Sequence, residues 1–554
     1  MVELRVTGHV HQWRLEGMLM DTFDSYVRSS DAVPLFLRSS KKEPVMSGAK
    51  MVVFVHGWSA NSTDTYGRLP DRLKAEASDA GLDIDVTHIY LSKYVSFRDE
   101  VRMEDIAQGM EAAIADEPDL RTAIVAGTKL IVITHSTGGP VAREWWHRFY
   151  VTSKRQCPMS HLIMLAPANF GSALAQLGKS TVSRLKSWSQ GVQPGQGVLD
   201  WLELGSASAW ELNESWIRQQ PSWTTEGEVF QFVLTGQTID RSFYDHVNSY
   251  TGETGSDGVV RVASANLNAK YVKLVQKTDA SGGAGGDWRA TRLTQAFSKT
   301  APPTAFAVLP GLAHSGESKG ILRSVKTDGP HPTVDAILQC LAVGNAADYS
   351  ALIDRFNALT ESTQAAEHRE VEKGLLFADR IYEHPTTTQV IVRLTDSSGY
   401  ALRDFDFLLT AWDPNAQDPQ LRTPDPDHLP DGFLLDRQRN RLQTNCLTFY
   451  LNHEVLQRPN DENKVPYLGI LIRPRPEPAP RAKTKDDFFV HYLTTSFGAD
   501  LKSISGLLQP NSTLLLDIQL MRVVRSGIFR LTTDTRTKDF TNDGPDGAIE
   551  SDPG

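Results

Sequence analysis

Residues 51–345 alternate short apolar runs with amphipathic segments. The segments Arg68–Ala80, Met103–Ala115 and Thr333–Leu341 repeat apolar residues at helical spacing, whereas the short runs are typical of strands buried on both faces. Such alternation predicts a mostly parallel sheet with helices on both of its faces. The strands predicted for this sheet are Met51–Val55, Val86–Leu91, Leu130–Ile133, His161–Leu165, Phe230–Leu234, Tyr271–Val275 and Phe306–Leu309.

The pattern changes after Pro385, where short strand-like runs follow one another without helices between them. Turns rich in proline and aspartate separate the runs. Regular short strands of this kind predict a β-sandwich. The runs are Gln389–Leu394, Asp406–Ala411, Cys446–Leu451, Tyr467–Ile472, Phe488–Leu493 and Ser512–Leu520.

A chain of 554 residues is too long for one hydrophobic core, so we expect several domains. Residues 1–48 carry strand-like residues that precede the main sheet, and a polar, helix-prone stretch separates the two patterns. The predicted organisation is an α/β domain at 1–345 with an insertion at 175–226, a helical connector at 346–386, a β-sandwich at 387–534 and a disordered tail at 535–554.

Charge and cysteine content narrow the function classes. The net charge of −10 argues against a nucleic-acid partner and against bulk attraction to anionic lipid. Three cysteines, far apart, provide neither a disulfide framework nor a cysteine-rich zinc site. The N-terminus lacks a basic region followed by an apolar one, and no apolar run is long enough to span a membrane. We therefore expect synthesis in the cytoplasm without a signal peptide.

The segment Leu130–Tyr150 has the pattern of a strand, a sharp turn and a helix, with Ser136 at the apex. Small residues at Gly138 and Gly139 let such a turn close and expose the serine oxygen. The arrangement resembles the nucleophile elbow of α/β-hydrolases, although Thr134 stands where the G-x-S-x-G motif has its first glycine. An activated serine implies attack on a carbonyl.

An activated serine needs a base and an acid that orients the base. In α/β-hydrolases the acid precedes the histidine along the chain. The turn Gly255–Val260 carries Asp257 and resembles the DG-V turn that holds the triad aspartate of bacterial lipases, with Asp240 as the rival acid. His314 follows the last predicted strand of the sheet, and His331, held between two prolines, is the alternative base.

The oxyanion of the intermediate requires two backbone N–H donors aimed at one point. Thr137, directly after the serine, supplies one at the start of a helix, whose dipole favours negative charge. The tripeptide His56-Gly57-Trp58 resembles the HG-x oxyanion loop of lipases, which points to the N–H of Trp58. We expect His56 and His135 to be structural, because histidines beside strand ends are more often hydrogen-bonded within the fold.

These motifs occur in the order that the family requires, at the ends of separate predicted strands over residues 50–345. The chain is thus similar to bacterial lipases and phospholipases of the α/β-hydrolase superfamily. The resemblance implies an α/β-hydrolase fold and a serine carboxylic-ester hydrolase that acts on lipid esters through a Ser136–His314–Asp257 triad and an acyl-enzyme. The alternatives are an esterase, thioesterase or acyltransferase on a non-lipid acyl substrate, or a non-catalytic binding protein on a hydrolase scaffold.

The insertion at 175–226 holds several tryptophans and a compact apolar cluster at Val198–Leu204. It resembles the lid of lipases, and its pattern fits a mobile lid and a fixed cap equally well. Either would line the site with apolar surface for an acyl chain, so we expect a lipid or membrane-surface substrate.

The appended β-domain resembles that of phospholipase effectors exported by contact-dependent secretion. The resemblance implies a signal-independent export route and a secretion-system or carrier partner for this domain. We expect no cofactor. Some bacterial lipases carry structural calcium near the active site, and no residue pattern in this sequence identifies its ligands. An acidic loop of the predicted β-sandwich offers oxygen ligands for calcium, but interleaved prolines favour a solvated loop. The aspartates of this loop are Asp413, Asp418, Asp425, Asp427 and Asp431.

Overall fold

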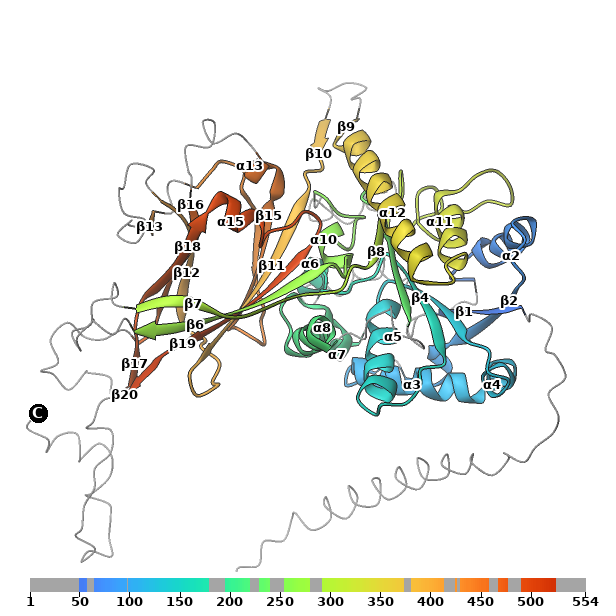
Figure 1. The fold of residues 1–554 in the computed structure, drawn as a ribbon, viewed down its shortest axis with the longest axis horizontal. Helices are drawn as coiled ribbons and strands as arrows, with labels where there is room; N and C mark the ends of the chain where they lie inside the picture. The colour runs from blue at the N-terminus through green and yellow to red at the C-terminus, as the bar shows by residue number, and fades with distance from the viewer. Residues whose placement is uncertain are drawn as a thin grey trace, which may run out of the picture. The chain divides into compact units, whose positions relative to one another are not determined.

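A computed structural model describes most of residues 49–524, which belong to one unit of the chain (Figure 1). The described ranges are 49–56, 64–96, 98–178, 195–219, 229–239, 254–278, 291–372, 380–412, 424–425, 429–457, 467–476 and 490–524. The strands predicted within residues 1–48 and the tail predicted at 535–554 lie outside the described residues.

A parallel sheet forms the centre of the N-terminal half. Every pair of neighbouring strands in it is parallel, and each is joined to its sequence neighbours by helices or long connections. This topology confirms the predicted α/β-hydrolase fold class. In spatial order the strands are β2 (Ile84–Tyr90), β1 (Lys50–His56), β3 (Leu130–His135), β4 (Met159–Leu165), β5 (Phe230–Thr235) and β8 (Ala305–Val308).

Successive residues of a strand point to opposite faces of the sheet, and here both sets of side chains are apolar. Helices cover both faces and bury them. In β1, Val53 and Val55 belong to one hydrophobic core, whereas Val52 and Phe54 belong to the other. The first core also contains side chains of α3 (Met103–Asp116), α4 (Pro118–Val125) and α5 (Gly138–Trp146), which η3 (His147–Val151) continues. The second contains side chains of α2 (Leu69–Asp79), α11 (Pro332–Leu341) and α12 (Ala346–Glu367) (Figure 1).

Helix α12 lies in the segment predicted to be a helical connector, but it does more than connect the two halves. It packs along the edge strand β8. The Val308 N–H of β8 donates to Thr360 Oγ1 at 3.0 Å, and the Ala305 N–H donates to the Tyr349 hydroxyl at 3.1 Å. That hydroxyl in turn donates to the Gln231 carbonyl of β5 at 2.6 Å. The helix thus satisfies N–H groups that an edge strand would otherwise leave unpaired. The hairpin β9 (Arg369–Glu372) and β10 (Arg380–Glu383) follows it.

The C-terminal half is the predicted β-sandwich, with one hydrophobic core between two sheets. The larger sheet has the order β14 (Leu434–Arg439), β15 (Cys446–Asn452), β11 (Thr387–Asp396), β19 (Thr513–Leu520), β6 (Ala269–Thr278) and β7 (Thr291–Thr300). The smaller sheet has the order β13 (Pro424–Asp425), β12 (Phe405–Trp412), β16 (Tyr467–Pro474) and β18 (Thr495–Asp500). A short pair, β17 (Val490–Tyr492) and β20 (Arg522–Val524), and the helices α13 (His453–Gln457) and α15 (Leu501–Ser505) complete it.

One predicted strand belongs to a different sheet from the one we expected. Tyr271–Val275 is a strand, but it lies in β6, which pairs with β19 and β7 rather than with the parallel sheet. Tyr271 points into the core of the α/β half, and Val272 points into the sandwich core. A strand buried on both faces has the same sequence pattern in either sheet. Residues 269–300, expected inside the domain at 1–345, therefore pair with the C-terminal strands.

Candidate active site

Ser136 lies at a sharp turn between β3 and α5. Its φ angle is 54°, a left-handed conformation that non-glycine residues rarely adopt. The Ser136 N–H donates to the Leu165 carbonyl at 3.0 Å, which ties the strained turn to the end of β4. Strain of this kind is found at functional sites, and in a nucleophile elbow it presents the serine oxygen above the sheet.

Two glycines allow the helix to approach the strand at this turn. A Cβ atom at Gly138 would lie 3.2 Å from the Cβ of Thr134, and one at Gly139 would lie 2.7 Å from the Cβ of Pro167. Thr134 occupies the position where the elbow motif usually has glycine. The missing side chain at position 138 leaves the space that the Thr134 side chain fills.

The structure brings Ser136, His314 and Asp257 together from three separate segments. His314 follows β8, and its Nε2 atom lies 3.0 Å from Ser136 Oγ. Its Nδ1 atom lies 2.9 Å from Asp257 Oδ2. In the arrangement that satisfies both contacts, the serine hydroxyl donates to Nε2, and Nδ1–H donates to the carboxylate. This geometry allows the imidazole to take the serine proton.

The carboxylate of Asp257 is held by its own turn. Asp257 Oδ1 accepts the N–H groups of Val259 at 3.0 Å and Val260 at 2.8 Å. The His314 N–H donates to the Asp257 carbonyl at 2.8 Å, so the two residues are also joined through the backbone. Both side chains are buried. The acid is thereby fixed in direction before any substrate binds.

His135 contacts the candidate base, as a structural residue would. Its Nε2–H donates to the His314 carbonyl at 3.2 Å, and the two rings lie 4.8 Å apart between centroids. Burial, followed by the charge of His314, lowers the pKa of His135 well below its ordinary value. His135 is therefore neutral near pH 7 and supports the loop that carries His314.

His56, the other histidine expected to be structural, also has a partner within the fold. Its Nε2 atom lies 2.9 Å from Nδ1 of His88. Burial and the neighbouring His88 lower the pKa of His56 to about 3. The Tyr66 hydroxyl closes this corner by donating to the Val55 carbonyl at 2.7 Å.

The alternative base, His331, has a separate structural role. Its Nδ1 atom accepts the Thr333 N–H at 3.2 Å and caps α11, while Nε2–H donates to Ser324 Oγ at 2.9 Å. Both ring nitrogens are thus used at the start of a helix. The rival acid Asp240 lies outside the described residues, as does the proposed oxyanion donor Trp58. Thr137 is the residue before α5, where N–H groups have no acceptor within the helix.

A buried arginine on α5 is a feature that sequence reasoning missed. Arg143 is 0% exposed, and its guanidinium donates to Asn169 Oδ1 at 3.2 Å and to Asn213 Oδ1 at 2.8 Å. It also lies 4.5 Å from the centre of the Trp216 ring. Burial lowers its pKa to about 9. The sequence feature that indicates a buried arginine here is its position among the apolar residues Val141, Ala142, Trp145 and Trp146.

These contacts attach part of the insertion to the nucleophile helix. The described part comprises the end of α6 (Ala173–Gly178), α7 (Gln196–Leu202) and α8 (Ala207–Gln219), and Asn213 and Trp216 lie on α8. The Trp216 ring also packs edge-on against Trp146 of α5, with centroids 4.9 Å apart. We refer to α7 and α8 as the cap.

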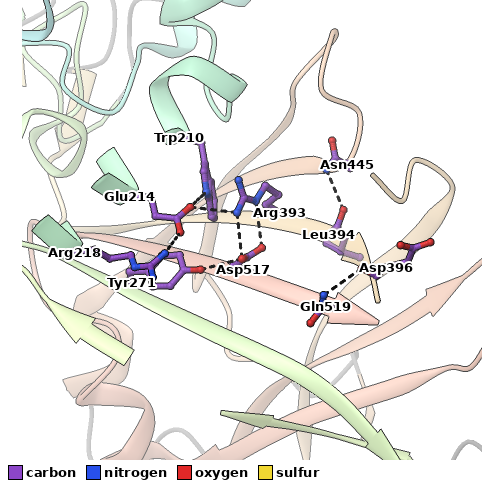
Figure 2. A network of polar contacts seen from close by, with 10 residues as sticks. All are labelled: Trp210, Glu214, Arg218, Tyr271, Arg393, Leu394, Asp396, Asn445, Asp517 and Gln519. Carbon is purple, nitrogen blue, oxygen red and sulfur yellow. Dashed lines mark hydrogen bonds and ion pairs between the residues drawn. The ribbon is translucent and has the colours of Figure 1, made fainter. Parts of the chain in front are cut away.

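The other side of the cap is bound to the sandwich, as Figure 2 shows. Glu214 of α8 accepts Nε1–H of Trp210 at 2.9 Å and pairs with Arg393 of β11 at 3.3 Å. Arg393 also pairs with Asp517 of β19 at 3.2 Å, and Asp517 accepts the Tyr271 hydroxyl of β6 at 2.9 Å. With anchors on both sides, the described helices have the contacts of a fixed cap rather than of a mobile lid.

Two further observations bear on ligands and membranes. Among the described residues, no three histidines, cysteines or acidic residues are grouped so that they could hold a metal ion. Most of the aspartate-rich loop considered for calcium lies outside the described residues. No helix in the described ranges is both long and apolar enough to cross a bilayer.

A parallel sheet with a strained serine at a strand–helix turn defines an α/β-hydrolase. The chain is similar to phospholipase PlaB from Legionella pneumophila, with 41% identity, a TM-score of 0.77, and coverage of 89% of this chain and 98% of that one. It is similar to PlaB in complex with thio-NAD at 39% identity, a TM-score of 0.75 and the same coverage. The chain belongs to the PlaB phospholipase family and is a hydrolase. No family model and no curated protein matches the sequence.

Proposed function

We propose that this hydrolase is a serine phospholipase in which Ser136 is the nucleophile, His314 the general base and Asp257 the residue that orients the base. The observation that carries the proposal is the pair of contacts made by His314, 3.0 Å to Ser136 Oγ and 2.9 Å to Asp257 Oδ2. Family membership supports a lipid ester as the substrate.

The steps follow from this geometry. As Ser136 Oγ attacks the acyl carbonyl, its proton passes to Nε2 of His314, and the carboxylate of Asp257 stabilises the resulting imidazolium. We expect the N–H groups of Thr137 and Trp58, the donors that the sequence motifs indicate, to bind the oxyanion. Collapse of the intermediate breaks the ester bond, and His314 returns the proton to the leaving alcohol. A water molecule then gives a proton to His314 and attacks the acyl-enzyme, and His314 returns that proton to Ser136 Oγ as the fatty acid leaves.

The cap supplies core rather than a lipid-facing belt. Trp201, Trp210 and Trp216 are 2–4% exposed and belong to the hydrophobic core of the α/β half. The remaining tryptophans of the insertion, Trp188 and Trp223, lie outside the described residues. The apolar surface for an acyl chain must therefore come from residues other than the three described tryptophans.

A labelling experiment tests the serine. A fluorophosphonate probe should label the wild-type chain and should fail to label Ser136→Ala, which should also lose phospholipid hydrolysis. Undiminished labelling of the variant would place the nucleophile elsewhere. Absence of labelling in the wild type, with no hydrolysis of any ester, would favour the non-catalytic binding protein.

A chain-length series tests the substrate. We expect higher kcat/KM on phospholipids with long acyl chains than on short, monomeric esters. The opposite preference would favour the esterase, thioesterase or acyltransferase. Export by a signal-independent route, with a carrier bound to the sandwich, stays a prediction, and a secretion assay of the full chain, with recovery of a carrier bound to it, would test it.

A further inference from the structure

We propose that Arg261 is a positioning residue for Asp257, and that through it the C-terminal sandwich holds the acid of the site in place. This inference deepens the proposed function and rests on it. It assigns the sandwich a part in the reaction that is separate from any partner the sandwich binds.

Asp257 and Arg261 lie at the two ends of one tight hairpin. Ser256 and Arg261 form an antiparallel bridge, and the Val262 N–H donates to the Gly255 carbonyl at 3.0 Å. Inside the hairpin, the Asp257 N–H donates to the Val260 carbonyl at 3.2 Å. With the carboxylate also bound to amides of the same turn, a displacement at one end of the hairpin is transmitted to the other.

The arginine end of the hairpin is attached to the larger sheet of the sandwich. Arg261 Nη1 lies 3.1 Å from Asp436 Oδ2 on β14, and the guanidinium carbon lies 3.9 Å from the centre of the Tyr450 ring on β15. The Arg261 side chain is 7% exposed. The ion pair neutralises the charge of the buried guanidinium, and stacking on the aromatic face fixes the orientation of its plane.

Tyr450 is itself fixed, so that it can serve as an anchor. Its hydroxyl lies 2.7 Å from Ser264 Oγ and accepts Nε2–H of Gln389 at 3.1 Å. Ser264 belongs to α10 (Val262–Ala265), the short helix that follows the hairpin. The anchor therefore contacts the chain on the far side of Arg261 as well as Arg261 itself.

The acid depends on this attachment because its hydrogen bond tolerates little movement. Asp257 Oδ2 reaches His314 Nδ1 at 2.9 Å, close to the usual length of such a bond. A displacement of the hairpin by about 1 Å would break it, and misplacement on that scale costs about 100-fold in rate. Loss of Arg261 should therefore reduce kcat more than it changes KM.

A double-mutant cycle separates positioning from a general structural role. Arg261→Gln should lower kcat on phospholipid by about 10- to 100-fold with little change in KM. In an Asp257→Asn background, where the positioned group is already disabled, the same substitution should cause no further loss. Arg261→Lys keeps the charge but not the planar stacking, so it should recover part of the rate.

Arg393→Gln is the matched control. Arg393 also joins the sandwich to the α/β half, through Glu214 at 3.3 Å and over the Trp210 ring at 4.4 Å, and these contacts do not involve the hairpin. Any loss that Arg393→Gln causes should be the same in the wild-type and Asp257→Asn backgrounds. If the loss from Arg261→Gln also persists unchanged in Asp257→Asn, Arg261 has only a structural role and the inference is wrong.

Two other outcomes are distinguishable. If Asp257→Asn alone leaves kcat unchanged, the acid of the proposed triad is misassigned, and the inference falls with it. If Asp257→Asn lowers kcat but Arg261→Gln leaves it unchanged, only the inference is wrong. Should Arg261→Gln fail to fold, Asp436→Asn removes the ion pair, leaves the stacking on Tyr450, and is placed in the same cycle with the same expectations.

Discussion

The close contact between Thr134 and Gly138 predicts that the nucleophile turn is sensitive to a single methyl group. In Gly138→Ala the new Cβ would lie 3.2 Å from the Cβ of Thr134, whereas ordinary contacts begin at 3.4 Å. The turn must therefore open by roughly 0.2 Å. Since a misplacement of about 1 Å costs about 100-fold, a proportionate share of the free energy gives a loss of about 2.5-fold in kcat.

The assay is hydrolysis of a long-chain phospholipid, with the rate of fluorophosphonate labelling as a second measure of the serine. Thr134→Gly is the matched control, because it removes the side chain that the alanine would meet. We expect Gly138→Ala to lower kcat about 2.5-fold in the wild type but to have little effect in Thr134→Gly. That difference corresponds to a coupling of about 0.5 kcal/mol.

Two results would refute the reasoning. Full activity of Gly138→Ala would mean that the turn absorbs the methyl group without moving the serine. A loss that is the same in both backgrounds would mean that it arises from the helix start and not from contact with Thr134. Overpacking should also lower stability by about 1 kcal/mol, measurable as a shift in the denaturation midpoint.

Three further outcomes concern stability. Thr134→Val should raise the free energy of unfolding by about 1 kcal/mol, since the buried Thr134 hydroxyl has no hydrogen-bond partner among the described residues; a lower denaturation midpoint would contradict this. Arg143→Met should lower stability by about 3 kcal/mol, because it leaves the buried amide oxygens of Asn169 and Asn213 without their donor; an unchanged midpoint would show that these oxygens find other partners. His56, with a folded pKa of about 3 against an ordinary 6.5, contributes stability that is complete above pH 6.5 and is lost as the pH falls, because the unfolded chain then binds the proton more readily. Between pH 7 and pH 5 this loss is about 2 kcal/mol, so His56→Asn should show a smaller decrease over that range than the wild type, and an equal decrease would contradict the assignment.

Local sequence patterns were sufficient for most of the α/β half. The apolar run at Leu130–Ile133, the small residues after Ser136 and the helical spacing beyond them all depend on neighbours in the chain, and β3 and α5 form where they predict. The order of the motifs also indicated Asp257 and His314, because the carboxyl ends of parallel strands meet at one edge of a sheet. Backbone propensity and hydrophobic period act over a few residues, so a sequence displays them directly.

Only the tertiary structure decided which of two candidate histidines contacts the serine and which sheet an apolar strand joins. His314 and His331 both lie between β8 and α11 in the chain, but only His314 reaches Ser136, while His331 caps a helix. The strand at Tyr271–Val275 could join either sheet, and pairing with β19, more than 200 residues away in the chain, settled it. The contacts of Arg143 and Arg261 likewise join segments that are remote in sequence. Hydrogen bonds and ion pairs between distant segments depend on the tertiary packing that brings those segments together. The local periodicity of the sequence contains no information about that packing.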